Sequence, residues 1–366
     1  MSALRAVVIK EFWALLRDPR GRITLVVPPL LQLLIFSFAA TLEVRNVDIG
    51  VLDRSSGAAS SEIVSRLAGS PNFARIVRLE SAAALEQAID RQEVIAALVI
   101  DGDFDRSLAR GESATVGVVL DGRRSNAAQI VGSYVAQIAG EAGAELRPDR
   151  PPPSAPAVTT NWFNPNLEYL WFNLPSLIVI IVSIAGLSIT AQAVAREREL
   201  GTFDQLMVSP LTVPQILIGK MLPPFAVGVV NGTVFLILAP LVFGVPFTGS
   251  LALFYLGLVA YLLAVVGIGM FVSALSKTQQ QAFLGSFVVT VPVILLSGFA
   301  SPIENMPGWL QTVTYANPAR YFLDISLGQF LKAQPADVVF ADLWPLVAIA
   351  AVTLTASGWL FRARME

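Results

Sequence analysis

Six long apolar segments constrain the fold of this chain more than any other feature of its sequence. They cover residues 23–42, 170–194, 222–243, 251–275, 283–300 and 344–361. An α-helix needs about 20 predominantly apolar residues to cross a bilayer. Charged residues make up only 14% of the chain, against about 25% in soluble domains. The sequence therefore predicts a polytopic α-helical membrane protein with six transmembrane helices.

The stretch between the first two apolar segments, residues 43–168, has a different composition. Charged residues return, and short β-rich runs at 47–52, 74–79, 94–100 and 115–120 alternate with helical patterns that end in a longer one at 125–146. Such alternation predicts a compact α/β domain inserted between transmembrane helices 1 and 2. A proline-rich stretch at 148–156 predicts a stiff linker that leads back to the membrane.

The first 20 residues have the pattern of an amphipathic helix lying in the membrane interface. Apolar residues recur at helical spacing, the intervening positions are rich in Arg and Lys, and Trp13 suits the headgroup region. We interpret residues 21–42 as transmembrane helix 1. A cleaved signal peptide is the alternative, because Ala39 and Ala40 are small. Near the other end, segment 301–343 is half apolar and interrupted by prolines, which predicts short re-entrant or interfacial helices.

The distribution of Arg and Lys predicts which side of the membrane each part occupies. Six spans place both termini on one side, and most of the short-loop cations lie in the leader, the 196–220 loop, Lys277 and the C-terminal tail. Because short cytoplasmic loops carry the excess of Arg and Lys, we expect both termini in the cytoplasm. The α/β domain is then extracytoplasmic.

Several classes of function have no support in the residues. The chain has neither Cys nor His, and its net charge of −2 gives no reason to expect nucleic acid. No phosphate-binding loop is visible, because the only Gly-Lys pair, Gly219-Lys220, is followed by Met221. The six predicted spans contain no carboxylate that could relay protons or cations. We therefore expect no catalytic residue, metal or cofactor in this chain.

Three amides are candidates for polar contacts along a pathway through the membrane: Gln32, Asn173 and Asn231. Strong polar groups are costly inside a bilayer, so each needs a partner there. Hydrogen bonding between helices is the alternative role, and it requires no substrate.

The loop between the second and third apolar segments, about residues 195–220, is charged and structured. A helical pattern ends in Arg196, Glu197, Arg198 and Glu199, and Gly201 interrupts it. Phe203, Leu206 and Met207 then follow at helical spacing, which would place them on one face. We interpret Pro210 and Pro214 as turning the chain. This pattern predicts a docking element for a partner that supplies energy, since the chain shows no motor of its own; an ordinary polar loop is the alternative.

The sequence AREREL-GTFDQLMVSPLT, which runs from Ala195 to Thr212, closely resembles the signature of ABC-2 type exporter permeases, and Gly219-Lys220 follows it. The resemblance covers nearly the whole chain. It includes the leader helix, the large domain after the first span and the proline-rich and aromatic segment before the last. It is nearest to the drug- and ion-export subgroup with a large extracytoplasmic domain.

This resemblance implies a permease subunit of an ATP-driven exporter. Two permease chains, as a homodimer or a pair of paralogues, would form the pathway above two separate ATPase subunits that hold ATP and Mg²⁺. The leader would be the elbow helix, and a periplasmic adaptor is a candidate partner. The loop would hold the coupling helix, with the following residues contacting the ATPase: Arg196, Glu197, Arg198, Glu199, Gly201, Thr202, Phe203, Gln205, Leu206, Met207 and Pro210.

The absence of buried carboxylates favours a lipophilic or amphipathic substrate, drug-like or lipid-like, over a bare metal cation. Two other functions stay open. A secondary transporter or channel would work without an ATPase and would need an acid in its pore. A membrane-anchored receptor or scaffold would act through the α/β domain, but it would not need five clustered spans.

Overall fold

The computed structural model of the chain describes residues 3–17, 27–35, 47–121, 125–146, 163–164, 168–203, 208 and 211–363. The chain forms two compact units. The helical unit contains Met1–Ala40 and Asn161–Glu366, and the α/β unit contains Thr41–Thr160.

The α/β unit is built on a four-stranded sheet in the order β2-β1-β3-β4. Strand β1 pairs in parallel with β2 and β3, whereas β3 and β4 are antiparallel. The elements coincide with the β-rich runs and helical patterns seen in the sequence. Their bounds are β1 Val47–Asp53, α3 Ala58–Gly69, β2 Phe73–Arg78, α4 Ala82–Asp90, β3 Ala96–Ile100, α5 Phe104–Ala109, β4 Val116–Leu120 and α6 Ser125–Leu146.

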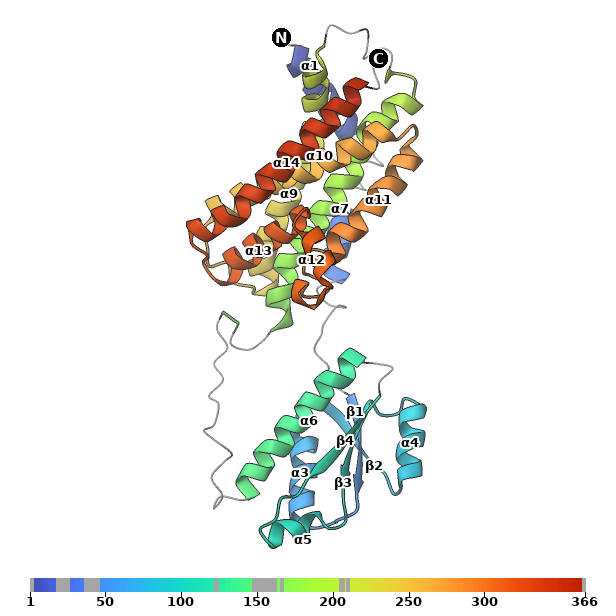
Figure 1. The fold of residues 1–366 in the computed structure, drawn as a ribbon, viewed down its shortest axis with the longest axis vertical. Coiled ribbons are helices and arrows are strands. Elements are labelled where there is room, and N and C mark those ends of the chain that lie inside the picture. Colours follow the sequence, from blue (N-terminus) through green and yellow to red (C-terminus); the bar gives the residue numbers. More distant parts are fainter. Residues whose placement is uncertain are drawn as a thin grey trace. The chain divides into compact units, whose positions relative to one another are not determined.

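Helices cover both faces of this sheet (Figure 1). On one face, α3 and α6 pack on the even-numbered core residues of β3, such as Leu98, which is completely buried. On the other face, Leu85 of α4 packs against Leu52 and Ala97. Alternate residues of a strand point to opposite faces, so strands buried on both sides are apolar at nearly every position.

Asp105 of α5 holds the start of α3 in this unit. Its carboxylate accepts hydrogen bonds from the backbone N–H of Ala59 at 2.7 Å and from the Ser55 hydroxyl at 2.8 Å. A Cβ added at Gly57 would lie 2.2 Å from Asp105 Cγ, so only glycine lets the two segments approach this closely. Partial burial works to raise the pKa of Asp105, but the hydrogen bonds from Ser55, Ala59 and Ser60 outweigh it and leave the pKa lowered.

Within the part of the chain that the structure describes, four helices are long and apolar enough to cross a membrane. They are α7 Tyr169–Glu199, α9 Val213–Phe243, α10 Leu251–Leu275 and α14 Ala336–Ala363. The most apolar stretch of α7 is 67% buried, against 33% for α9 and 28% for α14, so α7 lies at the centre of the helical unit (Figure 1). A fifth apolar helix, α11 Gln279–Leu295, is shorter. Residues 27–35, inside the first predicted span, are also helical.

Several helix ends differ from the sequence prediction, including the start of α11, which is Gln279 instead of residue 283. Helix α9 begins at Val213 instead of residue 222, so Pro214 lies in its first turn and does not turn the chain. Proline fits there because the first N–H groups of a helix have no partner within the helix, and Gln215 Oε1 caps the N–H of Thr212 at 3.0 Å. Helix α14 begins at Ala336 instead of 344. Helix α11 ends before residue 300, where Gly298 has a φ of +97°.

The segment before α14, predicted to hold short helices, contains a 3-10 turn at Ile303–Asn305, α12 Gly308–Thr314 and α13 Pro318–Leu331. Helix α13 packs on α7, α10 and α14. Ser326 donates a hydrogen bond to the carbonyl of Pro175 inside α7, and the Asn317 side chain donates one to the carbonyl of Val293 in α11. These bonds attach α13 to the long helices.

Close helix contacts in the bundle depend on small residues. A Cβ added at Gly228 or Gly232 of α9 would lie 2.3 Å or 2.8 Å from a leucine of α10. Between α7 and α10, the buried Tyr261 hydroxyl donates to the carbonyl of Val179 at 3.2 Å and contacts the Ser183 hydroxyl. Small residues and interhelical hydrogen bonds of this kind are the usual basis of packing between membrane helices.

Candidate functional site

The predicted loop begins where α7 ends, and a left-handed glycine ends that helix. Gly201 has a φ of +71°. Its N–H donates to the carbonyl of Arg198 at 3.2 Å, and the N–H of Thr202 donates to the carbonyl of Glu197 at 3.0 Å. This pair of bonds is the Schellman motif, which satisfies the last carbonyls of a helix. The helix break predicted at Gly201 is confirmed.

A buried lysine organises this end of the helical unit. Lys220 of α9 is only 3% exposed, and its ammonium lies 2.5 Å from Glu197 Oε1 and 2.7 Å from Glu11 Oε1. Glu11 belongs to helix α1, Ala3–Arg17, and Glu197 to the last turn of α7. Lys10 of α1 adds a second cation 3.0 Å from Glu197 Oε1. The network therefore links the beginning of the chain to both helices that flank the loop.

Two features of this network bear on the sequence prediction. Glu197 was expected among the loop residues that contact a partner, but its carboxylate binds Lys10, Lys220 and the Thr202 hydroxyl. Lys220 was noted only as part of the Gly-Lys pair, and Glu11 was not singled out. A signal was present in the sequence, since a lysine within a long apolar helix requires a counter-charge.

Helix α1 lies directly on α9 beside this network. A Cβ added at Gly219 would lie 2.4 Å from Cγ1 of Val7, so glycine is what lets α1 approach the backbone of α9 here. The side chain of Val7 is buried in this contact. The Gly219-Lys220 pair thus combines a close apolar contact with an ion pair to the same helix. Together they fix α1 to the start of α9.

Arg198 and Glu199 attach the end of α7 to the turn between α10 and α11. The Arg198 guanidinium donates to the carbonyls of Ala274 and Ser276, both at 2.9 Å. The Glu199 carboxylate accepts the N–H of Gln279 at 2.7 Å, at the start of α11. The cation thus meets the C-terminal end of α10 and the anion meets the N-terminal end of α11, as the helix dipoles favour.

Phe203 packs within the chain. Its ring lies 5.8 Å from the ring of Phe361 near the end of α14, in an edge-on arrangement, and the Arg198 guanidinium lies 4.9 Å from its centroid. The predicted partners on its face, Leu206 and Met207, lie outside the described residues, as do Gln205 and Pro210. Phe203 therefore connects the loop to α14.

Several residues of the loop are exposed to solvent. Arg196 and Glu199 are exposed, Leu200 is 62% exposed and Val208 is 87% exposed. Leu200 and Val208 were not among the predicted contact residues. At this end of the helical unit, α1 and the last turns of α7 and α14 lie together (Figure 1).

The three candidate pathway amides lie on separate helical stretches. Asn173 is fully buried in α7, and Asn231 is almost fully buried in α9, where its Nδ2 has no hydrogen-bond partner among the described residues. Gln32 is half-buried within the helical residues 27–35. Helices α7 and α9 pack together. The structure places Asn173 and Asn231 on helices that pack against each other.

Comparison with known proteins agrees with this architecture. The family model described as ABC-2 family transporter protein matches residues 20–359. The chain is 44% identical over 363 residues to the probable multidrug ABC transporter permease YbhR of Escherichia coli K12, with 99% of each chain covered. It is 30% identical to the probable multidrug ABC transporter permease YbhS of the same strain, covering 98% of this chain and 96% of that one. The matched residues include the apolar helices, the α/β unit and the Lys220 network apart from α1, and the chain is a membrane protein of the ABC-2 transporter family.

Proposed function

We propose that this chain is the permease subunit of an ATP-driven exporter and forms the pathway for a lipophilic or amphipathic substrate, drug-like or lipid-like. The proposal draws on the family assignment and on the names of YbhR and YbhS as multidrug permeases. The chain catalyses no covalent reaction in this proposal. ATP and Mg²⁺ are bound and used by two separate ABC ATPase subunits.

The proposed arrangement has six transmembrane helices and two permease chains, identical or paralogous, in the bacterial inner membrane. Both termini and the 195–220 loop face the cytoplasm, and the α/β unit, inserted between helices 1 and 2, faces away from it. The excess of Arg and Lys in the short loops supports this orientation. An outer adaptor is a candidate partner of the α/β unit. Gln32, Asn173 and Asn231 are candidates for lining the pathway.

The observation that carries the proposal is the set of contacts around the loop. Lys220, Glu197 and Glu11 tie α1, α7 and α9 together, while Arg198 attaches α7 to α10 and Phe203 contacts α14. Removing one partner of a buried ion pair costs about 3–5 kcal/mol, so such a network resists distortion. A push on the loop is then transmitted to several long helices at once, which is what a coupling element requires.

In this proposal the ATPase contacts residues 195–210, with Arg196 and Glu199 at a charged rim and Leu206 and Met207 on the apolar side. Leu200 and Val208, both exposed, are further candidates for the apolar part of this contact. An amphipathic element that enters an apolar groove on a partner is a common mode of recognition. Glu197, Arg198 and Phe203 serve instead to hold the loop on its own chain.

Purification in mild detergent tests this function. The chain should co-purify with an ABC ATPase, and the reconstituted complex should hydrolyse ATP faster when a lipophilic substrate is added. Leu206→Asp should weaken both results, because it places an unpaired charge in an apolar contact. Substrate transport by the purified chain alone, without any ATPase, would contradict the proposal and favour a secondary transporter.

A further inference from the structure

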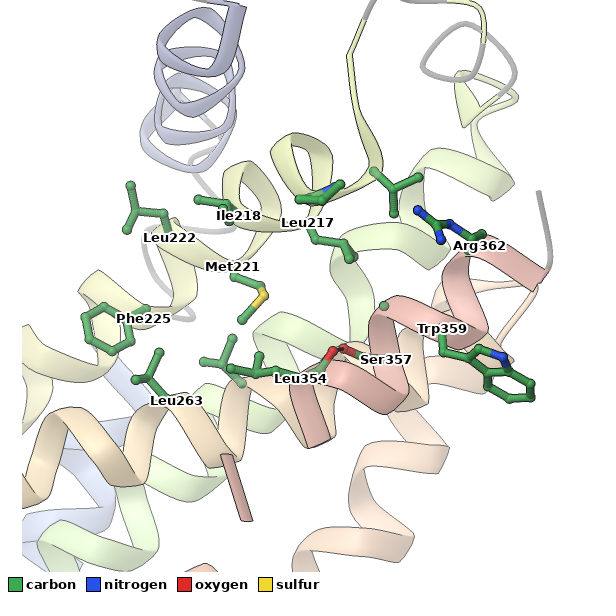
Figure 2. Close-up of a pocket in the computed structure, with 14 residues that line it drawn as sticks. Leu217, Ile218, Met221, Leu222, Phe225, Leu263, Leu354, Ser357, Trp359 and Arg362 are labelled. Atoms are coloured by element: carbon green, nitrogen blue, oxygen red, sulfur yellow. Dashed lines mark hydrogen bonds between the residues drawn. The ribbon is translucent and has the colours of Figure 1, made fainter. Parts of the chain in front are cut away.

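A cavity of about 640 Å³ opens in the helical unit between α9, α10 and α14. It extends from Phe225 at one end to Arg362 at the other (Figure 2). Leu217 and Met221 of α9 and Leu354 of α14 form much of its wall. Its volume lies within the range of about 300–1,000 Å³ that is usual for sites that bind small molecules.

The residues that line the cavity are almost all apolar, with one charged group among them. Arg362 is the only charged side chain among the lining residues, and no carboxylate lines the cavity. The Ser357 hydroxyl is already bound to the carbonyl of Leu354. Within the described part of the chain, no ion pair is found for Arg362. The cavity therefore suits a ligand with an apolar body and one anionic group at its end.

Two observations place the cationic end of the cavity at the depth of lipid headgroups. Trp359 lies beside it and is 71% exposed, and tryptophan is enriched at the membrane interface. Val213 and Pro214, which also line the cavity, form the first turn of α9 directly after the charged loop. Phe225 lies three turns deeper along the same helix. A lipid in this orientation would extend its chain from the interface toward the membrane interior.

We propose that this cavity binds a phospholipid whose headgroup has a net negative charge. One acyl chain lies between α9 and α14, and the headgroup phosphate, not balanced by a choline or other cation, lies on the Arg362 guanidinium. Guanidinium groups bind phosphate oxygens through charge-assisted hydrogen bonds. Basic pockets between transmembrane helices are known to hold anionic headgroups. The proposal requires only that the helices lie in a membrane, and it does not depend on transport or on an ATPase.

Two substitutions distinguish the contribution of the lipid headgroup to binding from that of its acyl chain. Arg362→Gln removes the charge and keeps a side chain of similar length. Gly358→Leu fills the cavity: a Cβ at Gly358 meets only Leu217 Cδ1 at 3.6 Å, so the backbone tolerates it and the rest of the side chain occupies the space. Lys277→Gln is the matched control. Lys277 is also an exposed cation, in the turn between α10 and α11, and it does not line the cavity.

Native mass spectrometry of the full chain in detergent, titrated with phosphatidylglycerol and with phosphatidylcholine of identical chains, tests the proposal. The unaltered chain should bind one phosphatidylglycerol about five- to tenfold more tightly than phosphatidylcholine. Arg362→Gln should abolish this difference in affinity, and Gly358→Leu should weaken the binding of both lipids. Lys277→Gln should change neither.

Three results would overturn the assignment. Equal binding of both lipids to the unaltered chain would remove the role of the anionic headgroup. If Lys277→Gln and Arg362→Gln reduce the affinity for phosphatidylglycerol equally, general surface charge attracts the lipid and this cavity does not. If Gly358→Leu leaves both lipids bound and instead changes the oligomeric state in the same spectra, a second copy of the chain occupies this face.

Discussion

The Lys220 ammonium lies 2.5 Å from Glu197 Oε1 and joins the first turns of α9 to the last turn of α7 across the loop that separates them. Lys220 is almost completely buried, and Glu197 and Glu11 of α1 balance its charge. The loop is thus held at both of its ends by one cation. Because a buried charge without a partner is costly, this relationship should dominate the stability of this region.

Lys220→Met should destabilise the helical unit by about 3–5 kcal/mol, because it leaves Glu11 and Glu197 close together with only Lys10 to compensate them. Thermal unfolding in detergent measures the loss. Lys277→Met, which removes an exposed cation near the same end, should change stability by no more than about 0.5 kcal/mol. The double variant Lys220→Met/Glu197→Gln should recover part of the loss, since the two residues are in direct contact. Additive effects in the double variant would contradict the pairing.

Arg198→Ala should loosen the loop from the turn between α10 and α11. Its two hydrogen bonds to the carbonyls of Ala274 and Ser276 involve a charged donor, and their loss should cost about 2 kcal/mol. Arg198→Lys should rescue little, because a compact ammonium cannot bridge both carbonyls and also cover the Phe203 ring. Arg196→Ala, two residues earlier and exposed at the proposed ATPase contact, is the control for stability and should leave thermal unfolding unchanged. Thermal unfolding and the substrate-stimulated rate of ATP hydrolysis should fall together for Arg198→Ala only.

Gly201→Ala should cost about 1–2 kcal/mol, because the φ of +71° is unfavourable for a residue with a Cβ. Gly201→Pro should cost more, since proline fixes φ near −65° and removes the N–H that donates to Arg198. Gly111→Ala in the α/β unit provides a matched control, with a φ of +80° and equally open surroundings. Both alanine variants should lower stability, but only the Gly201 variants should reduce substrate-stimulated ATP hydrolysis. Equal effects on hydrolysis would show that the helix end at Gly201 has no part in coupling.

The positions of the long helices and of the strands could be predicted from the sequence because they depend on local patterns. Apolar length identified α7, α9 and α10, and β-rich runs identified all four strands of the described sheet. Gly201 was predicted correctly as a helix end, because glycine is the usual residue at a left-handed position. The predicted start of the helix at residue 222 was wrong, because α9 already begins at Val213. Proline occurs both in chain-reversing loops and at the first positions of a helix, so Pro214 alone could not decide between them.

The contacts of the candidate site could not be predicted in the same way. Lys220 and Glu11 are far apart in sequence, and their pairing depends on how α1 packs against Gly219. Helical spacing predicted a face containing Phe203, but it could not show that this ring meets Phe361 of the last helix. Such contacts follow from tertiary packing, which periodicity within one segment does not contain.

Asp105→Asn should make the start of α3 less stable and change its response to pH. The pKa of Asp105 in the folded chain is below its ordinary value of about 3.8, so the carboxylate stabilises the fold at neutral pH, and this contribution is lost as the pH falls below that value. Hydrogen exchange of the Ala59 amide in the full chain should be slow at pH 7 and should speed up relative to its neighbours at low pH. Asp105→Asn should abolish this difference in the exchange rate of the Ala59 amide between pH 7 and low pH. Asp103→Asn is the control, because the Asp103 side chain makes no capping hydrogen bond.

The proposed orientation can be tested directly because the chain contains no cysteine, so a single introduced thiol is the only labelling site. Ser65 is exposed on α3 of the α/β unit, and Lys277 is exposed in the turn between α10 and α11. In intact spheroplasts, Ser65→Cys should react with a membrane-impermeant maleimide, whereas Lys277→Cys should react only after permeabilisation. Both positions are exposed in the structure, so a thiol that fails to react is protected by the membrane and not by burial within the protein. Each variant should first be labelled in detergent, where both must react. The reverse pattern in spheroplasts would place the loop outside the cytoplasm, where no ATPase could reach it, and would eliminate the coupling role of residues 195–210.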